Sequence, residues 1–169
     1  MKPKKIFQFL VVAFMGSLLL IPTNSFAAGK ADFTGKWILN ESKSNLGEGR
    51  TFSAVKMNVQ QNGNTISIER TRSGRNGQER TTNETLTMDG KENIIKNENR
   101  STVSVATWSD DGNTLTIKSQ REFSRQGETF QMKSTETWTM GADGKTLKIQ
   151  SDSSSQRGER SVTLVYDKE

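Results

Sequence analysis

The stretch "TFQMKSTETWTM", residues Thr129–Met140, alternates between two kinds of side chain. Its even-numbered positions include Phe130, Met132 and Trp138, whereas its odd-numbered positions carry only Thr, Gln and Lys. Side chains of a β-strand point alternately to its two faces, so this pattern is typical of a strand with one face inward and one in water. The stretch "TLTIKSQREF", Thr114–Phe123, repeats the pattern. The sequence therefore predicts half-buried antiparallel strands.

Turn signals separate these strands at intervals of roughly ten residues. Four of them begin with Asn-Gly or Asp-Gly, which supply the positive φ angles of a tight hairpin; they lie at Asn62, Asp89, Asp111 and Asp143. Beyond the N-terminal apolar run we find no helical spacing of apolar residues. We predict an all-β fold, an up-and-down meander of about eight to ten antiparallel strands closed into a barrel, because closure removes both sheet edges. A two-sheet sandwich is the alternative, although it needs crossing connections.

The first 28 residues, "MKPKKIFQFLVVAFMGSLLLIPTNSFAA", read as a targeting segment. A basic start precedes an apolar run to Ile21, and Ser25-Phe26-Ala27 matches the small-x-small cleavage rule. We predict a signal peptide over residues 1–27 and a single domain over residues 28–169, exported to the periplasm or secreted. After cleavage we expect no stable membrane insertion; an uncleaved anchor is the alternative.

Composition narrows the classes of function. Three of the 24 Lys and Arg residues lie in the leader, which has no acidic residue, so the mature domain has 21 basic against 19 acidic residues. Such a balance gives little electrostatic drive toward nucleic acid, and we expect no nucleic-acid partner. The chain has no His and no Cys. This excludes His- and Cys-based nucleophilic catalysis and His-bound zinc or haem, and we expect no enzyme activity, metal or cofactor.

The segment "DFTGKWILN", Asp32–Asn40, opens the predicted meander. Phe33, Gly35, Trp37 and Leu39 share one face if the segment is a strand. A buried Trp supplies a large apolar contact area, and the missing side chain at Gly35 lets another group approach closely. We interpret Gly35 and Trp37 as a structural plug of the barrel.

The longer stretch "FTGKWILNESKS" resembles the first-strand signature of lipocalin-like (calycin) barrels, and more closely the small exported lipocalin-like domains of Gram-negative bacteria. The resemblance spans about Asp32 to Lys168. It implies a closed β-barrel in which Trp37 plugs one end and a basic side chain of the last strand, Arg160 or Lys168, covers it. The residues that carry it are Gly35, Trp37, Asn40, Lys43 and Ser44.

Several polar residues occupy strand positions that alternate in phase with the inward-facing apolar residues. If the alternation holds, the barrel interior contains charged side chains that must pair with one another or line a cavity open to water. An apolar end is expected near the Asn-Gly and Asp-Gly turns, formed by Val59, Met88, Trp138, Met140 and Leu147. The candidate ligand-binding residues are Arg70, Arg72, Glu84, Arg121, Met132, Glu136 and Trp138.

Trp108 sits out of phase with Val103 and Val105. This predicts either a bulge that returns the ring to the core or an exposed ring. We favour the core position.

Three functions are compatible with these patterns. The first is binding of a small apolar or amphipathic molecule in the barrel, with Arg70, Arg72 or Arg121 meeting an anionic head group above an apolar floor. The second is a filled barrel that acts as a protein-interaction or inhibitor module through its loops. The third is an enzyme that uses Glu84 and Glu136 as a carboxylate pair. We expect a monomer.

The leader can be tested directly. In a Gram-negative host the purified protein should begin at Ala28, and its intact mass should correspond to residues 28–169. Replacing Ala27 by Leu should block processing, because the cleavage rule requires a small residue there. A full-length mass in the membrane fraction of the wild type would instead show an uncleaved anchor.

Overall fold

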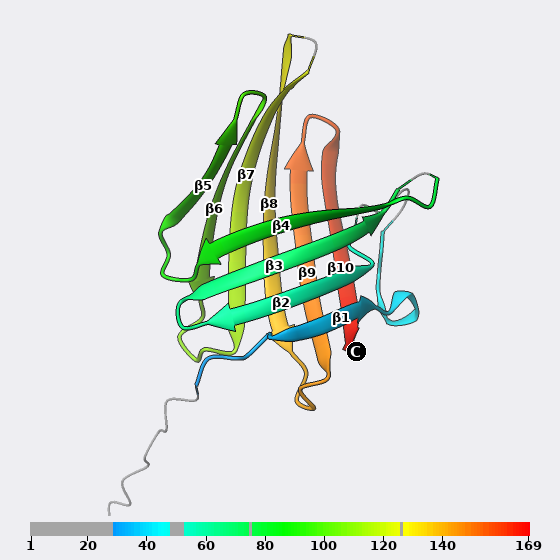
Figure 1. Ribbon diagram of the computed structural model, residues 1–169, viewed down its shortest axis with the longest axis vertical. Helices are drawn as coiled ribbons and strands as arrows, with labels where there is room; N and C mark the ends of the chain where they lie inside the picture. Colours follow the sequence, from blue (N-terminus) through cyan, green and yellow to red (C-terminus); the bar gives the residue numbers. More distant parts are fainter. Residues whose placement is uncertain (1–28, 48–52, 75, 126) are drawn as a thin grey trace, which may run out of the picture.

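The computed structural model describes residues 29–47, 53–74, 76–125 and 127–169 (Figure 1). The predicted signal peptide lies outside these residues. Within them, no helix is long and apolar enough to cross a membrane. The elements are β1 (Gly35–Leu39), the short 3-10 helix η1 (Glu41–Lys43), β2 (Lys56–Asn62), β3 (Thr65–Ser73), β4 (Glu79–Thr87), β5 (Glu92–Asn97), β6 (Arg100–Trp108), β7 (Thr114–Arg125), β8 (Glu128–Met140), β9 (Thr146–Ser155) and β10 (Gly158–Lys168).

The ten strands form one antiparallel sheet in the order β4-β3-β2-β1-β10-β9-β8-β7-β6-β5. Every neighbouring pair is consecutive in the chain except β1–β10, which joins the first strand to the last. Figure 1 shows β1–β4 crossing in front of the sheet that runs from β6 to β10, with β5 at its margin, so the sheet folds over on itself. The two end strands, β4 and β5, are not paired with each other. The predicted up-and-down barrel is confirmed, with ten strands and incomplete closure.

The apolar floor of the barrel is a densely packed core. The predicted apolar end is confirmed: Val59, Met88, Trp138 and Leu147 are at most 2% exposed, and Met140 packs against them. Strand register places one row of inward residues across five strands of the back sheet, from β6 to β10. This row consists of Trp108, Leu115, Trp138, Ile149 and Leu164.

Trp108 lies partly buried against the core, as favoured, but without a bulge. The β6–β7 register runs without interruption to Trp108 opposite Leu115. The Trp108 ring stacks on Phe33 with centroids 5.7 Å apart. The inward face of β6 carries Thr102, Ser104, Ala106 and Trp108, all buried or half-buried. The expectation of a bulge was wrong because the valines, which looked like the inward set, lie on the outer face.

Trp37 occupies the place where β1 pairs with the end of β10. Its side chain is 0% exposed, and its Nε1–H donates to the carbonyl of Phe33 at 2.9 Å. The ammonium of Lys168 lies 5.3 Å from the Trp37 ring centroid. A Cβ on Gly35, whose φ is 150°, would lie 2.6 Å from Cε of Lys168. Of the two basic residues expected to cover the ring, Lys168 does so, while Arg160 bonds the carbonyl of Leu46.

Replacing Gly35 by Ala should therefore lower stability by about 1–3 kcal/mol, because the backbone conformation is strained for a residue with a side chain. The new Cβ should also push Lys168 off the ring, a contact worth about 0.5–1 kcal/mol. Lys168→Ala alone should lose only that contact. The two changes should thus be less than additive in urea unfolding. Strict additivity would show that Gly35 does not make room for Lys168.

Candidate functional site

Above the apolar floor, the inward rows of the back sheet become progressively more polar. Register places three successive rows there, each crossing β6 to β10. The sequence signals this change, because Ser and Thr replace Leu and Ile at inward positions. In order from the floor outward, the rows are Ala106–Ile117–Glu136–Ser151–Val162, Ser104–Ser119–Ser134–Ser153–Arg160 and Thr102–Arg121–Met132–Ser155–Gly158.

Arg70 of β3 forms two ion pairs directly above the floor. Its Nη1–H donates to Oε2 of Glu84 at 2.8 Å, and its Nη2–H donates to Oε2 of Glu136 at 2.8 Å. We call these three residues the ion triad. The Arg70 side chain is only 11% exposed. Burial by itself would lower the pKa of Arg70, but the charges of Glu136 and Glu84 more than offset this and raise the pKa above its usual value.

Trp138 and Ser104 make further contacts with the side chains of the ion triad. The indole Nε1–H of Trp138 donates to Oε2 of Glu136 at 3.0 Å, and the guanidinium of Arg70 lies 5.7 Å from the Trp138 ring centroid. On the other side, the hydroxyl of Ser104 donates to Oε1 of Glu84 at 3.4 Å. Of the two sequence-based alternatives for inward charges, pairing with one another holds for these three residues. The triad also links the front sheet, through β3 and β4, to β8 of the back sheet.

Two further arginines, Arg72 and Arg121, lie near the triad. Arg72 donates to the hydroxyl of Thr82 at 3.0 Å, and burial together with the charge of Arg70 lowers its pKa. Burial also lowers the pKa of Arg121, and the charge of Arg100 lowers it further. The Nε of Arg121 is buried and has no hydrogen-bond partner among the described groups. This part of the interior therefore concentrates positive charge, while Glu84 and Glu136 are already bonded to Arg70.

An apolar rim lies beyond Arg121. Phe123 of β7 and Phe130 of β8 stack with centroids 5.2 Å apart. They are the next inward pair after Arg121 and Met132, and all four side chains are half-buried. Figure 1 shows β7 and β8 rising past β4, beyond the cover of the front sheet. We call this region, from the serine row to the two phenylalanines, the open half of the barrel.

The structure divides the predicted site residues into two groups. Arg70, Glu84, Glu136 and Trp138 form one bonded network that seals the floor, and Trp138 is 0% exposed. Arg72, Arg121 and Met132 are instead half-buried in or beside the open half. The role of all seven as ligand contacts stays a prediction. Sequence reasoning missed Phe123 and Phe130 as site residues, although both share the inward parity of Arg121 and Met132.

Both carboxylates that the enzyme alternative requires are bonded to Arg70. Glu84 and Glu136 approach the same guanidinium from opposite sheets. Any substrate that used both carboxylates would have to displace Arg70. The arrangement therefore favours a structural role for the pair.

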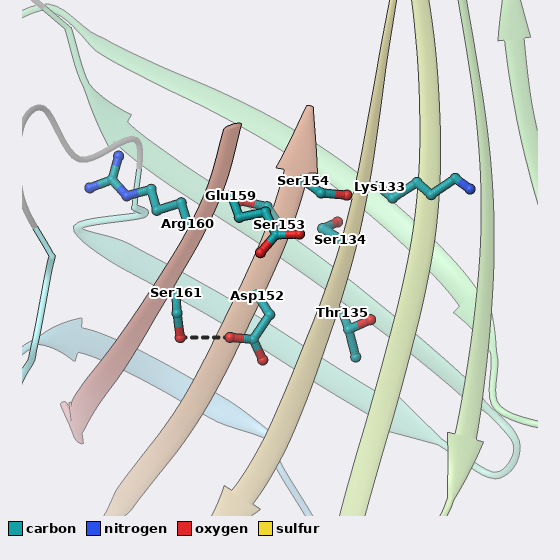
Figure 2. Close-up of a pocket in the computed structure, with 9 residues that line it drawn as sticks. All are labelled: Lys133, Ser134, Thr135, Asp152, Ser153, Ser154, Glu159, Arg160 and Ser161. Carbon is teal, nitrogen blue, oxygen red and sulfur yellow. Dashed lines mark hydrogen bonds between the residues drawn. The ribbon is translucent and has the colours of Figure 1, made fainter. Parts of the chain in front are cut away.

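A shallow hollow lies along β8, β9 and β10, lined by residues from both faces of these strands (Figure 2). Within it, the hydroxyl of Ser161 donates to Oδ1 of Asp152 at 2.6 Å, a bond that lowers the pKa of Asp152. The hollow is open to solvent and its lining has no large apolar side chain, so it offers little apolar contact to a ligand. It is lined by Lys133, Ser134, Thr135, Asp152, Ser153, Ser154, Glu159, Arg160 and Ser161.

Comparison with solved structures identifies a protein of similar fold. Zebrafish ileal bile acid-binding protein, solved in complex with cholic acid, superposes with a TM-score of 0.52 at 19% sequence identity. The alignment covers 81% of this chain and 98% of the zebrafish chain. The chain therefore shares its barrel fold with this protein. No protein-family model matches the chain, and no curated protein matches it by sequence.

The ion triad can be tested by removing one or all of its charges. Arg70→Met should lower the free energy of unfolding by about 2–4 kcal/mol, because it leaves two partly buried carboxylates without a countercharge. The triple variant R70M/E84M/E136M should recover most of that loss, since it leaves no unpaired charge. Glu69→Gln, on the outer face of the same strand, is the matched control. Urea unfolding measures these free energies. If Arg70→Met were as stable as the wild type, the assigned role of the ion triad would be wrong.

Proposed function

We propose that this protein binds a small anionic amphipathic molecule in the open half of its barrel. The observation that carries the proposal is Arg121. Its buried Nε has no hydrogen-bond partner among the described residues, and its neighbours in the inward register are Met132 and the Phe123–Phe130 pair. Burial, and then the charges of neighbouring arginines, lower the pKa values of Arg121 and Arg72; an anionic group bound there would offset both effects. The adjacent apolar side chains would cover the rest of the ligand.

The filled floor determines how such a ligand would lie. The sequence suggested an apolar floor beneath the head group, but those apolar side chains are packed against one another and covered by the ion triad. A ligand in the open half would therefore point its charged end toward Arg72 and Arg121. Its apolar part would lie outward, against Met132 and the two phenylalanines.

The comparison supports a ligand of this class. The zebrafish protein is named for binding bile acids, and its bound cholic acid is an amphipathic anion. The shared fold makes the same kind of ligand reasonable for this chain. We further propose that binding takes place in the periplasm or outside the cell, as the predicted signal peptide indicates, and that the protein binds its ligand without converting it.

A protein-interaction module is the second candidate, favoured by the filled floor. If the barrel interior serves only stability, the surface must carry the function. The two candidates differ in whether the protein retains a small molecule.

Isothermal titration calorimetry with decanoate can distinguish the binding protein from the interaction module. Decanoate should bind to the wild type, and decyltrimethylammonium, a cation of the same tail length, should not. Arg121→Gln should weaken decanoate binding about tenfold to a hundredfold, the loss of one charged hydrogen bond. Lys118→Gln removes a positive charge from the outer face of the same strand and should leave the affinity unchanged.

Native mass spectrometry provides an independent readout. Protein purified from its own host should carry an added mass that decanoate displaces. If no mass co-purifies and decanoate does not bind, the binding function is wrong and the interaction module becomes the better candidate.

A further inference from the structure

Strand β5 is an open sheet edge with exposed apolar side chains. It pairs with β6 on one side, and the sheet order leaves its other side without a partner strand among the described residues. Ile94 is 63% exposed and Ile95 is 47% exposed. An exposed apolar edge of this kind is a template for pairing with another strand.

Strand β4 does not cover this edge. Figure 1 shows β4 crossing in front of the back sheet while β5 lies at its margin. The described hydrogen bonds between them join Thr87 to the side chain of Asn93: the Thr87 N–H donates to Oδ1 at 2.8 Å, and Nδ2 donates to the Thr87 carbonyl at 3.3 Å. The contact is therefore confined to the start of β5, and the rest of its edge remains accessible.

Register identifies the backbone groups that face outward from this edge. Asn97 and Arg100 flank the two-residue turn that joins β5 to β6. In such a hairpin the closing residues bond each other, and bonded residues then alternate along the strand. Asn97, Ile95 and Asn93 thus direct their backbone groups to β6. Glu92, Ile94 and Lys96 direct theirs to the open edge.

We propose that two copies of the chain associate through β5, paired antiparallel about a two-fold axis at Ile94. In this register Ile94 lies opposite Ile94 of the second copy. Glu92 lies opposite Lys96 of the second copy, and the same pair recurs on the other side of the axis. Each opposite-charge or apolar cross-strand pair contributes about 0.2–1 kcal/mol.

Charge complementarity selects this register over the others. An axis at Glu92 would oppose two glutamates, and an axis at Lys96 would oppose two lysines. An axis at residue 93 or 95 would place Ile94 opposite Glu92 or Lys96. An axis midway between two residues would pair a residue whose backbone groups point to the open edge with one whose backbone groups point to β6. The hydrogen-bond ladder between the copies could then not form.

The outward valines of β6 extend the apolar contact. Val103 lies directly opposite Ile94 in the β5–β6 pair and is half-buried on the outer face. Pairing of two copies would align Val103 and Ile94 of one copy with Ile94 and Val103 of the other. The valine that broke the expected inward pattern thus becomes part of an apolar row across the axis.

The geometry also limits the size of the assembly. A contact between identical edges is isologous and closes as a dimer. The remaining edge, β4, presents Glu79, Arg80 and a run of Thr and Asn, which disfavours further strand addition. Because a six-residue edge buries little area, the dimer should be weak, with the monomer prevailing at low concentration.

Sedimentation velocity over roughly 10 µM to 1 mM, the range of weak interfaces, tests the association. The wild type should shift from monomer to dimer with concentration. Glu92→Lys and Lys96→Glu should each weaken dimerisation at least about tenfold, because each opposes like charges at two places. The double variant E92K/K96E should restore it, since the swapped charges again attract. Glu128→Lys, the same charge change in the exposed β7–β8 hairpin, should leave dimerisation unchanged.

A disulfide tests the register. The chain has no Cys, so Ile94→Cys can form a disulfide only between copies. Opposed bonded residues have Cα atoms about 5.5 Å apart, within disulfide range. Oxidation should therefore give a covalent dimer, whereas Thr116→Cys on β7 should not. A wild type that stays monomeric throughout, a double variant that does not recover, or no crosslink at position 94 would each overturn the proposal. Decanoate binding is measured separately and does not depend on the outcome.

Discussion

The guanidinium of Arg70 is the contact on which the interior of this barrel depends. It reaches from β3 to carboxylates on β4 and β8, so a single side chain joins the front and back sheets. Two carboxylates this close would repel each other without a cation between them. With Arg70 in place, they form a polar lid over an apolar floor that contains Trp138.

This lid separates two parts of the barrel interior that differ in polarity. Below it the apolar side chains fill the space, and above it the inward rows carry serines and arginines before ending at two phenylalanines. The accessible part of the interior is thus cationic inside and apolar at its rim. A ligand of the kind proposed above would enter with its charged end first, because an apolar tail would gain nothing among buried cations.

Incomplete closure has a separate consequence at the surface. The break between β4 and β5 leaves two edges: β4 presents Glu79, Arg80 and a run of Thr and Asn, whereas β5 presents Ile94 and Ile95 between charged residues. Near the start of β5, the side chain of Asn93 hydrogen-bonds both the N–H and the carbonyl of Thr87 at the end of β4. These two bonds stand in place of a backbone ladder between the two strands. The barrel therefore needs no continuous β4–β5 pairing to hold its shape, and β5 remains free to pair elsewhere.

Much of this arrangement could be read from local pattern. The alternation of side chains placed Arg70, Glu84 and Glu136 inside, and glycine-containing turns at short intervals indicated a meander. The pattern failed at β6, where Val103 and Val105 suggested the inward face that Ser104 and Ala106 occupy. Alternation shows only that two faces differ, and small inward residues made the outer face look more apolar.

The sequence by itself determined the strands, their turns and the parity of each side chain, because these depend on neighbours two to four residues away. Only the tertiary structure decided that Arg70 satisfies both glutamates. It also decided that, among the described residues, the Nε of Arg121 has no partner and the outer edge of β5 has no partner strand. Those outcomes depend on contacts between residues far apart in the chain. Such contacts depend on how the sheet folds over on itself. Local residue spacing does not determine which distant strands come together.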